Sequence, residues 1–225
     1  MTSATAPHRS ALVVRGGWDG HVPEQATDRV LPFLRSNGFD LTVSDSLDSY
    51  LDAELMAAAD LVVQCWTMGE ISREQSAGLA AAVAAGTGLA GWHGGICDSF
   101  HADLLYHAVS GGQFINHHNP GFVPYQIDIV ADKADHEIVA GLSSFAITTE
   151  QYYVHVDPSN EVLATTRYVD DPRLPGLAGR LMPVTWTRTY GAGRVFVTTI
   201  GHKMEDFDVR EVDQMIARGL LWAAR

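Results

Sequence analysis

A single histidine surrounded by glycines is the part of the chain best placed to do chemistry. Residues 89–97 read LAGWHGGIC, with glycines on both sides of His93. A short apolar run leads into this segment, and Asp98 or Ser99 can cap a helix after it. Strand, sharp turn and helix also form the nucleophile elbow, where crowding requires residues without a Cβ and often a positive φ. Nucleophile-elbow enzymes present Ser or Cys at this point, whereas this chain presents an imidazole.

The elements that must position this turn can be predicted from the first half of the chain. Continuous apolar runs predict strands buried on both faces at 11–15, 40–43 and 61–66. Helix-length segments separate them, one opening at Pro23 and one with a capping box of Ser72 and Gln75. This alternation predicts a mainly parallel sheet with helices on both faces, which binds ligands outside the carboxyl ends of its strands. The residues expected at those ends are Trp18, His21, Trp66, Trp92 and His93.

The second half of the chain has a different pattern. We expect a polar loop over 113–121 and then a strand over 125–130, whose strict alternation indicates one solvent-exposed face. Asp208 and Glu211 form a capping box for a final amphipathic helix. Antiparallel pairs should therefore extend one edge of the parallel sheet. The further strands are expected at 152–156, 161–165, 183–188 and 194–199, with a hairpin connection at 191–193.

Size, charge and cysteine content limit the possible functions. A chain of 225 residues with 46% hydrophobic content fits one α/β domain over 1–225, with residues 1–10 as a flexible tail. No segment is predicted to span a membrane or to act as a signal peptide, so we expect a cytoplasmic protein with Cys65 and Cys97 reduced. The net charge of −12 has no basic cluster against it, which argues against nucleic acid or membrane partners. A neutral small molecule suits this composition better.

Several motifs together resemble the ThuA-like family, named for trehalose utilisation. They are residues 91–95 (GWHGG), 111–117 (GGQFINH), 135–138 (DHEI), 150–153 (EQYY), 183–186 (PVTW) and 193–202 (GRVFVTTIGH). The resemblance covers nearly the whole chain. It implies a flavodoxin-like, class I glutamine amidotransferase-like fold, a three-layer sandwich, and a place in sugar catabolism beside oxidoreductases that make keto-sugars.

The chain departs from true glutamine amidotransferases at the turn itself. His93 stands where those enzymes have their Cys, which excludes glutamine hydrolysis through a thioester at that position. His202 falls where they keep the catalytic His. Cys97 lies near a predicted helix start and is an alternative nucleophile, with a packed thiol as the other interpretation.

The fold implied by the resemblance gathers several imidazoles and one carboxylate at one end of the sheet. The candidate catalytic residues are His93, Glu150 and His202. The candidate metal ligands are His21, His93, His117 and His202, which suit a divalent ion such as zinc. Without a metal, the same residues offer a general base and a group that polarises a carbonyl. No nucleotide cofactor is expected.

Aromatic side chains at strand ends can stack on the C–H faces of sugar rings. The candidate substrate-binding residues are Trp18, Trp66, Trp92 and Tyr152. The resemblance implies the substrate class, a keto-sugar or keto-glycoside derived from trehalose or a related disaccharide. Together with the candidate acid/base residues, it favours an enzyme that acts by isomerisation, elimination or hydrolysis, by general acid/base and possibly metal-assisted chemistry. A sugar oxidoreductase as a functional partner and a homo-oligomer are also expected. The alternatives are a non-catalytic sugar-binding or regulatory module and a Cys97-dependent hydrolase.

Overall fold

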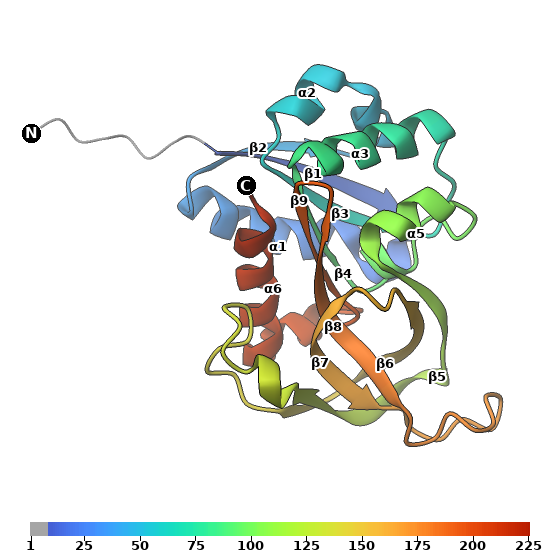
Figure 1. Cartoon of the computed structure of the whole chain (residues 1–225). Helices are drawn as coiled ribbons and strands as arrows, with labels where there is room; N and C mark the ends of the chain where they lie inside the picture. The colour runs from blue at the N-terminus through green and yellow to red at the C-terminus, as the bar shows by residue number, and fades with distance from the viewer. Residues whose placement is uncertain (1–8) are drawn as a thin grey trace, which may run out of the picture.

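Nine strands form one mixed sheet in the order β2-β1-β3-β4-β9-β8-β7-β5-β6 (Figure 1). The structure is a computed structural model that describes residues 9–225. The strands are β1 (Arg9–Gly17), β2 (Phe39–Ser44), β3 (Leu61–Thr67), β4 (Gly88–Trp92), β5 (Gly112–Ile129), β6 (Phe145–Val156), β7 (Glu161–Arg167), β8 (Leu181–Tyr190) and β9 (Gly193–Thr198).

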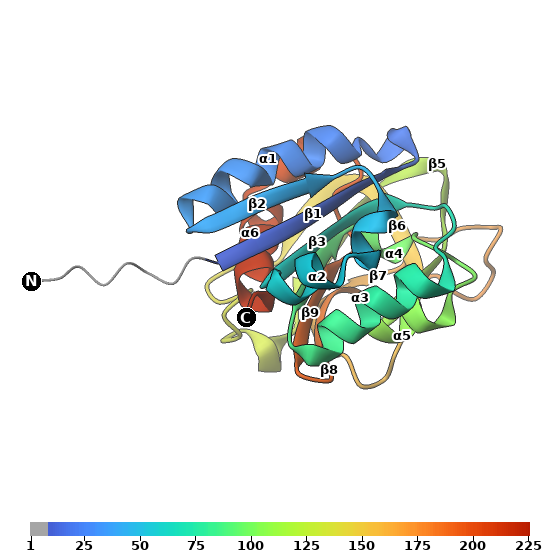
Figure 2. The same ribbon diagram turned by 90° about the horizontal axis from the view of Figure 1, so that it is seen from above.

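The first five positions of the sheet are parallel and carry helices on both faces. Strands β2, β1, β3, β4 and β9 pair in parallel. Helices α1 (Pro23–Ser36) and α6 (Arg210–Ala223) cover one face (Figure 2). Helices α2 (Ala53–Ala58), α3 (Arg73–Ala85) and α5 (Leu104–Ser110) cover the other. Neighbouring residues of one strand therefore enter different cores, Val13 the first and Leu12 the second. The apolar runs at 11–15 and 61–66 predicted this double coverage correctly. The run at 40–43 did not, because β2 is the edge strand and Asp40, Thr42 and Val43 are exposed.

The capping residues predicted for the helices are right at α3 and wrong after the His93 turn. Ser72 and Gln75 form the expected capping box at the start of α3. Neither Asp98 nor Ser99 caps a helix, because the four-residue α4 (Gly94–Cys97) begins directly after His93. Asp103 caps α5 instead, accepting a hydrogen bond from the backbone N–H of Tyr106 at 2.7 Å.

The final helix also lacks its expected cap. No side chain caps α6, because Asp208 lies in the short 3₁₀ helix η4 (Met204–Asp208) and pairs with Arg29 at 3.2 Å. The apolar face of α6 is nevertheless as expected, with Val212, Met215, Ile216 and Leu220 buried.

The remaining four strands are antiparallel and form a curved extension at one edge (Figure 1). The predicted polar loop over 113–121 is wrong, because this segment belongs to the first half of β5, and residues 113, 114, 116 and 117 pair with β6. Only residues 127–129 of β5 also pair with β7. The first half therefore has one strand neighbour and two register shifts, which lets it carry polar side chains without strict alternation.

The first residues that the structure describes belong to the sheet. Arg9 and Ser10 belong to β1, where Arg9 pairs with Phe39, so they are not part of a flexible tail. The rest of that expected tail, residues 1–8, lies outside the described residues. Within residues 9–225, no helix has the length and apolar character needed to cross a membrane.

Candidate metal centre

Three histidines lie at the carboxyl ends of parallel strands, where the fold places ligand sites. His21 ends the 3₁₀ helix η1 (Asp19–His21) after β1, His93 follows β4, and His202 follows β9. Glu150 comes from the middle of β6, in the antiparallel extension. The sheet and its curved extension thus bring residues 21, 93, 150 and 202 together.

The turn at His93 has the strained geometry expected of an elbow. His93 itself has φ 45° and ψ −139°, a region that residues with a Cβ rarely adopt. The flanking glycines do not carry the positive φ; they allow close approach. A Cβ on Gly94 would lie 2.1 Å from Nδ1 of His21, and one on Gly91 would lie 2.4 Å from the carbonyl oxygen of Gln64. The glycines therefore let His21 and β3 pack directly against the turn.

Glu150 Oε2 is the centre of the cluster. It lies 3.1 Å from Nδ1 of His202, 3.2 Å from Nε2 of His93 and 3.9 Å from Nε2 of His21. Nδ1 of His202 lies 3.3 Å from Nε2 of His93. One ligand atom from each of these four residues lies within 4.8 Å of every other.

Hydrogen bonds fix which nitrogen of His93 and His21 faces this centre. Nδ1 of His93 lies 2.8 Å from the carbonyl oxygen of Thr199, to which it can only donate. Its Nε2 therefore carries the lone pair that faces Glu150. Nδ1 of His21 similarly contacts the hydroxyl of Thr67 at 3.0 Å, which leaves Nε2 toward the cluster. Such outer contacts orient metal-binding histidines.

Burial decides the protonation of His93. The side chain is 1% exposed, and desolvation lowers its pKa from the ordinary 6.5 to about 3, so the imidazole is neutral. Burial alone would raise the pKa of Glu150, but hydrogen bonds from His202 and then His21 outweigh it and hold this pKa well below its usual range. The cluster therefore combines an ionised carboxylate with a neutral His93.

The donor set fits a metal ion in number, type and spacing. Ligands about 2.1 Å from a tetrahedral ion lie about 3.4 Å from one another, close to the three shorter contacts of this cluster. The hydroxyl of Tyr152 lies 2.8 Å from Nε2 of His93, and His202 can donate to Glu150. Nε2 has a single lone pair, so a cation between His93 and the Glu150 carboxylate would replace the hydroxyl of Tyr152 as its partner.

Asp206 supports the cluster from behind. Its buried Oδ2 accepts hydrogen bonds from the hydroxyl of Thr149 at 2.7 Å and from the backbone N–H of His202 at 2.9 Å. Thr149 directly precedes Glu150 on β6. A single carboxylate oxygen therefore connects the segments that carry His202 and Glu150.

His117 lies beside the four-residue cluster and is not one of its members. Its Nε2 is 3.7 Å from Oε1, the other carboxylate oxygen of Glu150. Its Nδ1 donates to the carbonyl oxygen of His118 at 2.6 Å, and Arg173 holds the carbonyl oxygen of His117 itself at 2.6 Å. The expected ligand set and this cluster share His21, His93 and His202, and the cluster has Glu150 where the expected set has His117.

The four aromatic residues predicted to bind sugar lie in four different environments. Trp18 is 48% exposed and its ring lies 4.9 Å from that of His21. Trp66 is partly buried beneath Gly16 and Gly69. Tyr152 is buried within the cluster. Trp92 does not fit the prediction, because it is 1% exposed and packs edge-on against Phe207 in the core.

Two residues near the cluster were not expected from the sequence. Phe122 is 47% exposed and its ring lies 5.0 Å from that of His202. Asp206 was the other. Neither belongs to a motif, and Phe122 lies just after the segment predicted to be a loop. No sequence signal identified them.

The two thiols are in the core. Cys65 and Cys97 are both free and buried. Burial raises the pKa of Cys65 to about 12 and that of Cys97 well above its ordinary value. Cys97 therefore lacks the exposure and the low pKa of a nucleophilic thiol.

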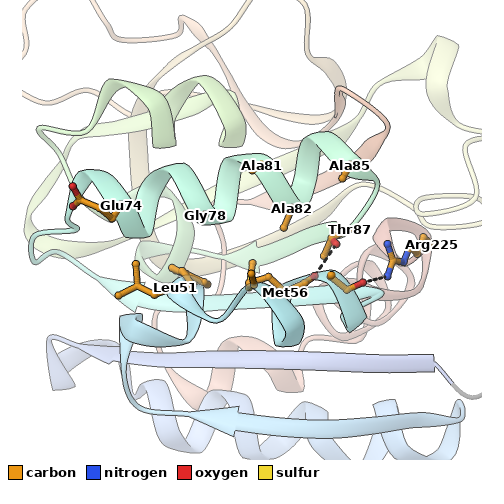
Figure 3. Close-up of a pocket in the computed structure, with 12 residues that line it drawn as sticks. Leu51, Met56, Glu74, Gly78, Ala81, Ala82, Ala85, Thr87 and Arg225 are labelled. Carbon is orange, nitrogen blue, oxygen red and sulfur yellow. Dashed lines mark hydrogen bonds between the residues drawn. The ribbon is translucent and has the colours of Figure 1, made fainter.

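An apolar groove lies apart from the cluster, on the outer side of α3 (Figure 3). It runs between α3 and the segment formed by the 3₁₀ helix η2 (Leu47–Leu51) and α2, with Glu74 near one end and Thr87 and Arg225 near the other. None of the four cluster residues lines it.

The fold and the cluster define a class: a mixed α/β protein with a histidine–carboxylate centre at the carboxyl edge of its parallel strands. The family whose model matches residues 10–223 is ThuA, described as trehalose utilisation. The chain belongs to this family, which confirms the resemblance drawn from the motifs.

Solved structures with the same fold include ThuA-like proteins from two organisms. The protein from Parabacteroides merdae has 19% sequence identity and a TM-score of 0.73, over 96% of this chain and 89% of that one. The protein from Bacteroides uniformis has 16% identity and a TM-score of 0.72, over 98% and 93%. The fold is also similar to 31% of a β-galactosidase from Bacillus circulans sp. alkalophilus, over 97% of this chain with 13% identity and a TM-score of 0.58. Comparison with curated proteins gives no match.

Proposed function

We propose that this protein is an enzyme of sugar catabolism that acts on a keto-glycoside derived from trehalose or a related disaccharide. The observation that carries the proposal is the buried centre of His21, His93, Glu150 and His202 with the half-exposed imidazole of His117 beside it. A carbonyl makes the hydrogen on the neighbouring carbon acidic. An enzyme for this substrate class needs a group that stabilises the enolate and a base that takes this proton.

In this proposal the four-residue centre holds a divalent ion such as zinc. When bound, the ion polarises the ketone oxygen of the substrate as a Lewis acid. The chain's own contribution is to orient the ligands: Thr199 fixes His93, Thr67 fixes His21, and Asp206 holds the segments of His202 and Glu150. The ionised Glu150 supplies the one negative charge of the ligand set.

His117 is the group best placed to take the proton. Because its Nδ1 donates to the carbonyl oxygen of His118, its Nε2 carries the lone pair. A proton taken up there forms an imidazolium 3.7 Å from Oε1 of Glu150, which stabilises the positive charge. Glu150 thus serves the centre with one oxygen and His117 with the other.

Two exposed aromatic rings flank the centre and support a sugar as substrate. Trp18 contacts His21 from one side and Phe122 contacts His202 from the other. Aromatic faces pack against the C–H faces of sugar rings, while hydroxyl groups bind nearby polar side chains. Trp18 therefore stays a candidate for stacking, and Phe122 replaces Trp92.

The surroundings of this activity follow from its chemistry. We place it in a reducing compartment, the cytoplasm, because both cysteines are free and buried. A sugar oxidoreductase must supply the ketone. The fold assignment that goes with the proposal is the flavodoxin-like, class I glutamine amidotransferase-like class, supported by the parallel half and by the ThuA-like neighbours. A homo-oligomer also remains part of the proposal.

The test combines metal analysis with turnover of a 3-keto-disaccharide. Protein purified without added ions should contain about one zinc or similar ion per chain, as one four-ligand site requires. His93→Ala should lose both the ion and turnover, whereas the matched variant His155→Ala, at an exposed histidine of β6, should keep both. Turnover by His93→Ala at the wild-type rate would refute the site. Sugar binding without turnover by the wild type would instead favour a non-catalytic module.

A further inference from the structure

Helix α3 has an outer face with almost no charge. Its residues read REQSAGLAAAVAA, and no charged side chain follows Glu74 within this helix. Ala77, Ala81, Ala84 and Ala85 are exposed. A helix at a protein surface normally presents polar side chains to solvent, so an apolar outer face indicates a surface that binds a partner. The contrast is large in a chain with a formal net charge of −12.

The groove beside α3 extends this apolar surface. It has a volume of about 440 Å³ and separates α3 from η2 and α2 (Figure 3). Gly78, Ala81 and Ala82 line it on the side of α3, and Leu51, which is 51% exposed, lines it on the side of η2. The distance between two packed helices depends on the side chains at the contact, and small ones allow a close approach. The groove and the outer face of α3 can therefore accommodate another helix.

The polar groups in the middle of the groove are already bonded within the chain. The hydroxyl of Tyr50 donates to the side chain of Gln64, and that of Thr87 donates to the carbonyl oxygen of Ala59 at 3.0 Å. A pocket for a small polar molecule instead offers a few polar groups that converge on its ligand. The core of an interface between proteins is depleted of charged residues, as the middle of this groove is. We therefore expect the occupant to be a protein surface.

Among residues 9–225, the charged side chains that line the groove are Glu74 and Arg225, near its opposite ends (Figure 3). Nε of Arg225 donates to Asp60 at 2.9 Å, and Nη2 donates to the carbonyl oxygen of Ala57 at 2.7 Å. A guanidinium group has five N–H bonds, so Nη1 is left to donate to a further acceptor. Arg225 is thus oriented before any partner binds.

We propose that the outer face of α3 and its groove form a two-fold interface between two copies of this chain. This inference rests on the homo-oligomer of the proposed function, to which it assigns a surface. In a two-fold interface, a contact from residue i to residue j is always matched by one from j to i. Two antiparallel α3 helices place Glu74 of each protomer at the Arg225 end of its partner. One acid and one base at opposite ends of an uncharged patch are therefore complementary to a second copy.

Reversing the charge at each end gives a test that is specific to this symmetry. Sedimentation analysis would measure the dimer dissociation constant of the wild type, Glu74→Arg and Arg225→Glu. Each single variant puts like charges at both contacts, so the dimer should weaken by about 10-fold or more. An equimolar mixture of the two variants should recover the wild-type affinity, because both contacts of the mixed dimer join opposite charges. Glu54→Arg, at an exposed acid of α2 outside the groove, is the control and should change nothing.

A substitution in the middle of the patch tests the apolar contact. Ala81→Glu changes an exposed position, so the fold should be kept, and urea unfolding would verify this. In the dimer the new carboxylate would be buried without a partner and would face its own copy, so the dimer should weaken by about 100-fold or more. Turnover of the 3-keto-disaccharide, measured on the same samples, tests the proposed function separately.

Each result decides a different point. A wild-type protein that stays monomeric at every concentration would overturn the interface, leave the groove to another partner and leave the proposed activity intact. A dimer that neither Ala81→Glu nor the charge reversals weaken would also overturn it, because the contact would lie elsewhere. Failure of the mixed variants to recover affinity would contradict the two-fold arrangement. A wild-type dimer without turnover would refute the proposed activity and leave the interface standing.

Discussion

The two halves of the sheet contribute to the centre in different ways. The parallel half, β2-β1-β3-β4-β9, supplies three histidines from the ends of strands whose order in the sheet fixes their proximity. The antiparallel half, β8-β7-β5-β6, supplies Glu150 from the middle of a strand. The parallel half is covered by helices and buries His21 and His93, whereas His202 is partly buried. The antiparallel half forms the curved extension (Figure 1), and its Glu150 contacts His93 and His202.

Sheet topology thus fixes the positions of the three histidines, whereas the position of Glu150 depends on the local register of β5 and β6. Loops at the carboxyl ends of neighbouring parallel strands meet in any sheet of this type. Glu150 reaches the centre because β5 and β6 are out of regular register, with His117 opposite Tyr152 but Phe122 opposite Glu150. Three extra residues on β5 between these pairs bend the ribbon.

Removing the single contribution of the antiparallel half should have the largest effect. Glu150→Gln keeps the shape and removes the charge, so metal binding should weaken by more than the about 10–100-fold typical of outer partners. Competition with a chelating dye, and the visible spectrum of the cobalt-substituted protein, would measure this. Glu161→Gln, at an exposed carboxylate of β7, is the control. Unchanged affinity in Glu150→Gln would mean that the parallel half binds the ion alone.

The sequence predicts the parallel half of the centre better than the antiparallel half. Apolar runs and the glycine-rich turn place His21, His93 and His202 at strand ends, and the structure agrees. Glu150 could be assigned only through the family motif, because no alternation pattern reveals a three-residue register shift. Trp92 was misplaced because a strand end does not say which side chain turns inward, and here it is Trp92 that packs on Phe207.

The close packing inside the parallel half can be tested at Gly94. A methyl group there would lie 2.1 Å from Nδ1 of the buried His21, so Gly94→Ala should reduce the free energy of unfolding by about 1–3 kcal/mol, as overpacking does. It should also weaken metal binding. Urea titration and the same dye assay would measure both.

A double-mutant cycle is the control for Gly94. On a His21→Ala background the added methyl group has room, so the cost in stability of Gly94→Ala should largely disappear. An equal loss of stability on both backgrounds would show that Gly94 is needed for its backbone conformation and not to make room for the ring of His21.

The connection between the halves depends on Asp206. Asp206→Ala removes the acceptor shared by Thr149 and His202, so metal affinity should fall by about 10–100-fold. Asp206→Asn keeps one acceptor oxygen and should restore most of that loss, and Thr149→Val should cost less than Asp206→Ala. Metal titration of the folded variants measures the effect. Wild-type metal affinity in all three variants would show that the two halves of the sheet hold their positions without the Asp206 carboxylate.

The smallest expected effect is the pH dependence of stability that comes from the neutral His93 of the parallel half. Burial lowers the pKa of His93 to about 3 from 6.5, so below pH 6.5 the unfolded chain binds a proton at this residue that the folded chain does not. The free energy of unfolding of the metal-free protein should therefore decrease as the pH is lowered from 6.5 to 4.5, by up to about 1.4 kcal/mol per pH unit. Glu150 is ionised in both states down to about pH 5.5; closer to pH 4.5, its ordinary pKa, the unfolded chain begins to protonate it and it adds slope of the same sign. Urea unfolding of the wild type and His93→Gln at several pH values isolates the contribution of His93, because the variant should lack this part of the slope. Equal slopes would mean that His93 is protonated when folded, so that the parallel half brings a cation to Glu150 instead of a neutral ligand for a metal ion.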